Sequence, residues 1–339
     1  MGVLDDLELA RAKYERGDWA AAYAAWADVP LDELGAAELE GLGTAAHLLG
    51  RHQICVQALQ RAYQLHLGAG DRAAACRSAF WLGMVFSENG DAAVAAGWAA
   101  RAQRLLDDLG GDVVEGGYVA LLAMHRHLVA GALPEARVSA QSVVSHGRRF
   151  GDRDLTAVGL AALGRLTLYA GRVPDGLALF DEAMASVTAG EVTSPIFAGN
   201  VYCVMIEGCQ EVSDLGRAAA WTAALTRWCS EQPGLIAFTG QCAVHRGQIM
   251  RLHGAFPAAI TEFDAAVRRY LASPTTAPAG VALAERGDVQ RLLGELEAAE
   301  ASYEQATDLG YEPQPGLALL WLARGRTPAA LAAVRRLLA

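Results

Sequence analysis

Apolar residues recur at helical spacing along most of the chain, in stretches that short glycine-centred breaks interrupt. Successive breaks lie 31 to 42 residues apart, and a period of this size indicates an internal helical repeat. A glycine that ends a helix takes a left-handed backbone conformation at low steric cost, so each break should turn the chain between two helices. With a serine in the place of one glycine, the breaks stand at Gly17, Gly50, Gly90, Gly131, Gly171, Ser213, Gly254, Gly294 and Gly325.

The residues around each break are repeated as well. In most repeats a small residue stands seven positions before the break, as at Gly83 and Gly164, and another stands five positions after it, as at Ala136. A large residue often follows four positions later, as at Phe180. Small residues let two antiparallel helices approach closely, and we expect the large side chain to fill the space between neighbouring hairpins.

This pattern resembles the tetratricopeptide repeat, which places a small residue, a turn glycine, an alanine and an aromatic residue in the same order. Most repeats here have about 40 residues against 34 in the family, so the helices or the links should be longer. The resemblance implies an all-α fold, a right-handed superhelical solenoid of about nine tetratricopeptide-like hairpins. No linker interrupts the pattern, so we expect a single array over residues 1–339 without a separate DNA-binding domain.

Composition excludes several classes of protein. Hydrophobic residues make up 53% of the chain and charged residues 19%, which is too apolar for a disordered chain. The net charge of −10 argues against a nucleic-acid surface, and no apolar run is long enough to span a membrane. The acidic N-terminus has no secretory signal, and the six cysteines contain no C-x-x-C pair. Free thiols in a reducing cytoplasm fit this pattern best.

The concave groove is the expected binding surface. In such arrays the first helix of each hairpin lines the groove, at positions about 13, 10, 6 and 3 residues before the turn. These positions are apolar and aromatic in the third to fifth repeats and polar in the sixth and seventh, as expected for a pocket that takes a small molecule or a peptide. The candidate ligand-binding residues are Phe80, Met84, Tyr118, His125, Arg165, Tyr169, Asn200, Cys203, Glu207, Gln210, Gln241 and Gln248.

Structural roles are an alternative for these residues. Phe80, Tyr118 and Tyr169 can be packing residues between tightly wound repeats. A polar cluster lies on helices that are otherwise rich in small and apolar residues, and its members are Asn200, Glu207, Gln210, Gln241 and Gln248. They can belong to a solvated face or to an internal hydrogen-bond network instead of a recognition surface.

Catalytic and metal motifs are weak. The eight histidines form no metal-binding spacing, and no phosphate-binding loop follows a strand. One possible nucleophilic set combines Cys203 or Cys242 with His245 and with Glu207 or Glu211. Buried cysteine is common as a small apolar filler in helical arrays. We therefore expect a protein that is not an enzyme and that uses no catalytic residue, metal or cofactor.

A second resemblance covers nearly the whole chain. The stretches 80–83, 99–106, 206–211, 228–229, 232–233, 240–246 and 312–316 resemble the tetratricopeptide-like sensor region of actinobacterial LuxR-type transcriptional regulators. This resemblance implies a module that senses a ligand or a partner. Such regulators usually end in a basic helix-turn-helix domain, which this sequence lacks. The expectation is a fragment or a free-standing relative that does not bind nucleic acid directly.

Two other functions stay open, namely a free-standing protein-interaction scaffold and a protein that sequesters a natural product. The last repeat favours association, because a terminal repeat normally has a polar outer face and this one is apolar. A homodimer through the C-terminal hairpin is therefore possible. The apolar residues of this hairpin are Leu317, Leu319, Leu320, Leu331, Val334 and Leu338.

Overall fold

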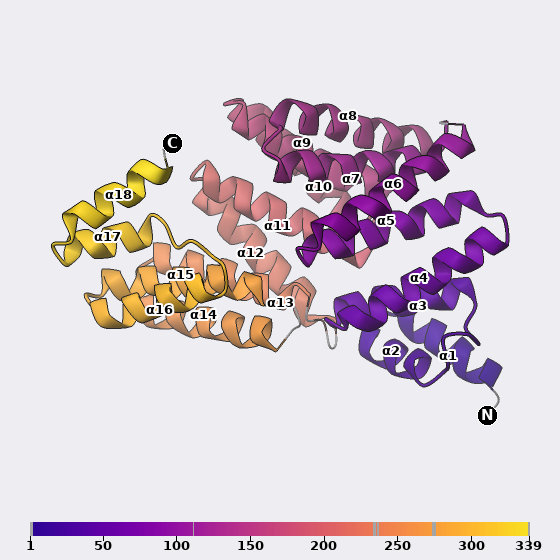
Figure 1. Cartoon of the computed structure of the whole chain (residues 1–339), viewed down its shortest axis with the longest axis horizontal. Helices are drawn as coiled ribbons and strands as arrows, with labels where there is room; N and C mark the ends of the chain where they lie inside the picture. Colours follow the sequence, from indigo (N-terminus) through magenta and orange to yellow (C-terminus); the bar gives the residue numbers. More distant parts are fainter. Residues whose placement is uncertain (1–2, 111, 233–234, 236, 273–275, 338–339) are drawn as a thin grey trace. The chain divides into compact units, whose positions relative to one another are not determined.

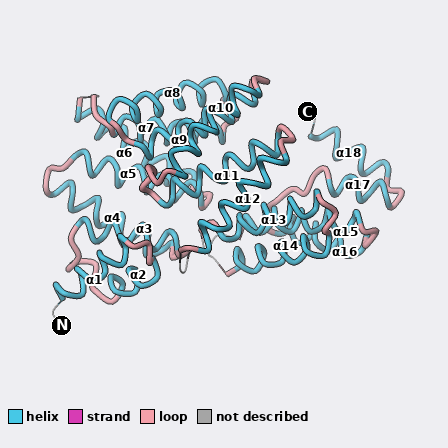
Figure 2. The backbone as a smooth tube through the Cα atoms, turned by 180° about the vertical axis from the view of Figure 1, so that it is seen from behind, coloured by secondary structure: helices cyan, strands magenta, loops and turns pink. Residues whose placement is uncertain are grey.

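The computed structural model describes residues 3–110, 112–232, 235, 237–272 and 276–337. Every regular element within these residues is an α-helix, and eighteen helices follow one another as hairpins (Figure 1). Short loops connect the helices (Figure 2). The prediction of an all-α solenoid of tetratricopeptide-like hairpins is confirmed. The chain divides into two compact units, Met1–Leu235 and Ile236–Ala339, called unit 1 and unit 2 below. A single array over residues 1–339 stays a prediction.

Unit 1 contains six hairpins. Each first helix packs antiparallel against the second helix of its own hairpin, and neighbouring hairpins stack through helix pairs such as α4 with α5, α8 with α9, and α9 with α11. Its helices are α1 (Val3–Glu15), α2 (Trp19–Ala27), α3 (Ala36–Leu48), α4 (His52–Gly68), α5 (Arg72–Glu88), α6 (Ala92–Leu109), α7 (Glu115–Val129), α8 (Leu133–Phe150), α9 (Arg153–Tyr169), α10 (Val173–Thr188), α11 (Pro195–Glu211) and α12 (Leu215–Ser230).

Unit 2 contains three hairpins that stack in the same way, with α14 packed against α15 and α16 against α17. Four aromatic or aliphatic side chains, Phe263, Val289, Tyr303 and Leu320, are buried in its core. Its helices are α13 (Thr239–Leu252), α14 (Phe256–Leu271), α15 (Ala277–Leu292), α16 (Leu296–Asp308), α17 (Gly316–Ala323) and α18 (Thr327–Leu337).

All nine expected breaks have a left-handed backbone. The eight break glycines have φ between 66° and 83°, and Ser213 has φ 60°. At Gly171 the amide donates to the Leu168 carbonyl, and the next amide donates to the Thr167 carbonyl. Ser213 makes the equivalent bond to the Gln210 carbonyl. The turns therefore satisfy the last carbonyls of each first helix, as a helix end requires.

Small and large residues fit together as the repeat predicts. A Cβ on Gly164 would lie 2.7 Å from Cδ1 of Phe180, and a Cβ on Gly247 would lie 2.5 Å from Cε1 of Phe263. Phe180 also reaches the next hairpin, where a Cβ on Gly208 would lie 2.6 Å from its ring. Each large residue therefore occupies space that only glycine leaves open, both within its hairpin and between hairpins.

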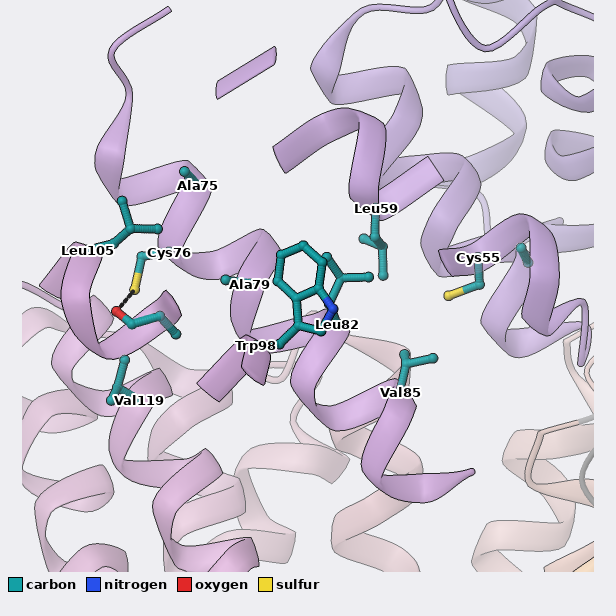
Figure 3. Close-up of a cluster of buried hydrophobic side chains, with 12 residues drawn as sticks. Cys55, Leu59, Ala75, Cys76, Ala79, Leu82, Val85, Trp98, Leu105 and Val119 are labelled. Carbon is teal, nitrogen blue, oxygen red and sulfur yellow. Dashed lines mark hydrogen bonds between the residues drawn. The ribbon is translucent and has the colours of Figure 1, made fainter. Parts of the chain in front are cut away.

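A cluster of buried apolar side chains joins the second, third and fourth hairpins (Figure 3). Leu59 of α4, Leu82 of α5, Trp98 of α6 and Val119 of α7 are all buried there. Cys76 lies in the same core and donates its thiol to the Ala102 carbonyl at 3.4 Å (Figure 3). Burial, with the nearby Glu115 charge, raises the pKa of this thiol to about 12, so it stays protonated and acts as a packing residue.

Candidate functional site

The first helices of four hairpins in unit 1, α5, α7, α9 and α11, enclose a cavity of about 360 Å³. We call it the central cavity. Its size lies at the lower end of the range for small-molecule pockets. Its polar lining residues are Glu88, His125, Arg165, Tyr169 and Asn200. The apolar lining residues are Trp81, Met84, Leu121, Met124, Leu128, Leu133, Val158, Ala162, Leu166, Ile196, Phe197 and Val204.

A cluster of four aromatic rings forms one wall of the central cavity. Trp81 of α5 stacks on Phe197 of α11, with ring centroids 5.1 Å apart and planes inclined by 27°. Phe80 packs edge-on against Tyr118 at 5.2 Å, and Tyr118 lies 6.5 Å from Phe197. The third and sixth hairpins therefore meet across the groove, although their residues are far apart in the sequence.

The other side of this wall faces a second cavity of about 570 Å³, which α1, α3, α5, α7 and the first turn of α11 line. Trp81 and Phe197 line both cavities. Tyr118 lies on the second cavity and donates its hydroxyl to Asp152 Oδ2 at 3.0 Å. Burial and the Asp152 charge raise the pKa of Tyr118, so this phenol stays a neutral donor.

Two carboxylates form ion pairs with Arg165, the only arginine among the residues that line the central cavity. Arg165 Nη1 lies 2.6 Å from Glu207 Oε2, and its Nη2 lies 2.5 Å from Glu211 Oε1. Tyr169 donates its hydroxyl to the same Glu211 oxygen at 3.2 Å. Burial acts to lower the pKa of Arg165, but the bond to Glu211 and the charges of Glu207 and Glu211 outweigh it and raise the pKa. The guanidinium therefore stays charged.

His125 lines the central cavity from α7. Burial lowers its pKa, and the negative charge of Glu88 offsets this only in part. The imidazole is therefore neutral at pH 7. It can act as one donor or one acceptor for a bound molecule.

The twelve candidate residues differ in where the structure places them. Met84, His125, Arg165, Tyr169 and Asn200 all line the central cavity, so the structure brings five of the twelve together. Tyr118 lines the second cavity, and Phe80 is fully buried in the wall between the two, which is the packing role that the sequence left open. Glu207 holds Arg165. Cys203 and Gln210 are half-buried on α11 and do not line the central cavity.

Gln241 and Gln248 belong to unit 2 and join an internal hydrogen-bond network. Tyr270 donates to Gln241 Oε1 at 3.0 Å, and Gln241 Nε2 lies 3.3 Å from His245 Nε2. His245 Nδ1 lies 3.4 Å from Gln248 Oε1, and Gln248 donates to Glu285 Oε1 at 2.9 Å. Their contact with a ligand stays a prediction.

The possible nucleophilic set divides between the units. Cys203, Glu207 and Glu211 lie on α11, whereas Cys242 and His245 lie on α13. His245 is buried, and burial lowers its pKa to about 4, against a smaller opposing contribution from its bond to Gln248. Its two ring nitrogens contact amides of its own helix. No group of three potential metal ligands occurs within the described residues.

The sequence analysis missed Trp81 and Phe197. Trp81 is one position beyond the expected groove residue Phe80 and lines the central cavity. Phe197 lies 16 residues before the turn at Ser213, one helical turn earlier than the positions counted. Extending the count by one turn would have found Phe197, but not its contact with Trp81.

Comparison with known proteins identifies the fold of the chain but no family. No family model matches the sequence. A comparison with curated proteins gives no match either.

Among the helices of the described chain, none is long and apolar enough to cross a membrane.

Solved structures resemble the whole chain. A Rap protein complexed with competence and sporulation factor has a TM-score of 0.58 at 12% identity, over 93% of this chain and 99% of that one. Aspartyl phosphate phosphatase F from Bacillus subtilis has a TM-score of 0.55 at 10% identity, over 91% and 94%. A signal-transduction ATPase with a tetratricopeptide-repeat sensor, from Pyrococcus horikoshii, has a TM-score of 0.50 at 14% identity, over 94% of this chain and 49% of that one. The chain is thus a tetratricopeptide-like helical-repeat protein.

Proposed function

We propose that this chain is the ligand-sensing array of a bacterial transcriptional regulator, and that the central cavity of unit 1 binds a small, largely apolar molecule. The observation that carries the proposal is the cavity itself. It has about 360 Å³ of space, a mostly apolar and aromatic lining, and a few polar groups, as ligand pockets have. If the helices served only to pack against one another, side chains would be expected to fill this space.

The regulator part rests on resemblance. The sequence resembles the sensor region of LuxR-type regulators, and one protein of similar fold has a tetratricopeptide-repeat sensor in its name. Another was solved in complex with competence and sporulation factor. On this proposal the chain acts by binding and not by catalysis. It does not contact nucleic acid itself, and it works in the cytoplasm, where its six free cysteines stay reduced.

The test fills the central cavity with a larger side chain and measures whether the protein still binds a small molecule. Ala162 is half-buried on the cavity lining, so Ala162→Trp places an indole in the space. Ala100→Trp is the matched control, because Ala100 is exposed on α6 and lies on neither cavity. Each protein is incubated with the small-molecule fraction of its host cell and weighed by native mass spectrometry.

We expect a reproducible adduct on the wild type and on Ala100→Trp, and none on Ala162→Trp. An adduct that survives in Ala162→Trp, or the absence of any adduct on the wild type, would contradict the proposal. An adduct whose mass changes with time would instead favour a protein that modifies a natural product. A tight, unchanging adduct without any effect of the chain on transcription would favour sequestration.

A docking scaffold is the second candidate, because the last hairpin keeps an apolar surface. Leu319, Leu322, Leu331, Val334 and Leu337 are each between 40% and 52% exposed, whereas Leu320 is buried. Leu338 lies outside the described residues. A second copy of this chain can cover these residues, as the next hairpin does in the interior of an array. A mass in solution that stays monomeric at every concentration would exclude this homodimer.

A further inference from the structure

The charged residues at the central cavity have an excess of negative charge. Glu88 lines the cavity, and Glu207 and Glu211 lie at its edge on Arg165. Arg165 is the only positive charge among the residues that line the cavity. The cavity lining and the partners of Arg165 therefore include three carboxylates and one guanidinium, while His125 is neutral and adds no compensating charge.

Arg165 cannot easily bind an anion. Its two terminal nitrogens already contact Glu207 and Glu211 at 2.6 and 2.5 Å, so an incoming carboxylate would have to displace one of them. Its Nε atom is buried and has no acceptor within the described residues, but it is also out of a ligand's reach because it has almost no accessible surface. A bound anion would thus lie beside like charges without a free donor pair.

A cation meets the opposite situation. Its charge would be attracted by Glu88, which is 44% exposed and lies 4.0 Å from His47 Nε2, and by the net negative group around Arg165. The rings of Trp81 and Phe197 add aromatic surface to the lining, and aromatic rings attract cations. The remaining walls, which include Met84, Leu121 and Val158, require an apolar body.

We propose that the ligand of the central cavity is an amphipathic cation, with an apolar body against Met84 and Phe197 and an ammonium group at Glu88. This inference rests on the proposed function and narrows it to one chemical class. Every charged side chain at the cavity can keep its own partner, because the attraction comes from the net charge of Glu88, Arg165, Glu207 and Glu211 together.

The test uses three probes with the same chain and different head groups, decyltrimethylammonium, decanol and decanoate. Their affinities for the full chain are measured by isothermal titration calorimetry below their micelle concentrations. We expect decyltrimethylammonium to bind at least about tenfold more tightly than decanoate, with decanol between them. We expect Glu88→Gln to reduce this preference about threefold, because it removes one negative charge from the lining. Glu8→Gln, on the exposed surface of α1, should leave it unchanged.

The outcomes separate the two proposals. Equal affinity for the three probes, or tighter binding of decanoate, would overturn the cation preference while leaving a cavity that binds small apolar molecules. A preference that Glu88→Gln and Glu8→Gln change equally would also overturn it, since the charge would then act from outside the cavity. If none of the probes binds, both the preference and the proposed function fail.

Discussion

Trp81 and Phe197 stack at 5.1 Å across the concave side of unit 1 and separate two cavities of about 360 and 570 Å³. They come from the third and the sixth hairpin. These hairpins are not neighbours in the stack, so their contact stabilises the arrangement of the array. The contact also forms a wall of the central cavity. This pair therefore lies between the two cavities, and Ile196 also lines both of them.

Replacing Phe197 tests this role. Phe197 is 4% exposed, so Phe197→Ala should lower the free energy of unfolding by about 3 kcal/mol and should connect the two cavities. Phe150 is 40% exposed at the end of α8, so Phe150→Ala should cost less than about 1 kcal/mol. Urea unfolding followed by tryptophan fluorescence measures both. Equal losses for the two variants would mean that the stack does not tie the hairpins together.

One glycine-to-alanine change should have opposite effects at two positions. A Cβ at Gly164 would lie 2.7 Å from Phe180 and 3.0 Å from the Gly176 carbonyl oxygen, so Gly164→Ala should destabilise by about 2 kcal/mol. Gly97 lies on the exposed side of α6 with no atom within 4 Å of its virtual Cβ. Gly97→Ala should stabilise by about 0.5 kcal/mol. Thermal unfolding of the two variants gives the signs, and a loss at both positions would refute the close-packing account.

Ser213 takes the left-handed conformation that glycine takes at the other eight breaks. A left-handed backbone costs an L-residue about 1 kcal/mol, so Ser213→Gly should stabilise the chain by somewhat less than that, given the larger entropy of glycine in the unfolded state. Gly171→Ser makes the reverse change at an equivalent turn and should destabilise by about 1 kcal/mol. Denaturant midpoints of both variants check this. A stabilised Gly171→Ser would contradict it.

His245 should make unit 2 sensitive to acid. Burial lowers its pKa from 6.5 to about 4, so the unfolded chain binds more protons than the folded one between these values. Stability should then fall as the pH is lowered from about 6.5 to about 4, by up to about 3 kcal/mol for this one group. Unfolding measured at several pH values should show this slope, and His245→Gln should remove it.

His253 is the control for this pH dependence. It lies on the exposed surface at the end of the same hairpin's first helix. His253→Gln should keep the wild-type slope. A slope that both substitutions reduce equally would mean that the effect does not come from the buried imidazole.

The repeat was predictable because its rules are local. A turn at Ser213 followed from the spacing of its neighbours, and the pairing of Gly247 with Phe263 followed from a small residue and a large one at fixed offsets. Such patterns reflect helix ends and helix–helix approach, which depend on residues close in the sequence. The fold class needed nothing more.

The site was predictable only in part. Counting back from the turns found Met84, His125 and Asn200, since each faces the groove from its own helix. The wall of Trp81 and Phe197 depends on how strongly the array curves, and the sequence does not contain this curvature in any local pattern. The role of Gln248 depended likewise on a partner 37 residues away, Glu285.

The most direct test of the central cavity uses its methionines. Met84 and Met124 line the cavity, whereas Met184 is buried elsewhere in unit 1 and Met250 lies in unit 2. The full chain, labelled with ¹³C at the methionine methyl groups, is titrated with decanol, whose neutral head group is independent of the charge preference. We predict saturable shifts of the Met84 and Met124 signals, with those of Met184 and Met250 unchanged. Signals of Met84 and Met124 that stay still, or that move no more than that of Met250, would contradict a ligand-binding cavity in unit 1.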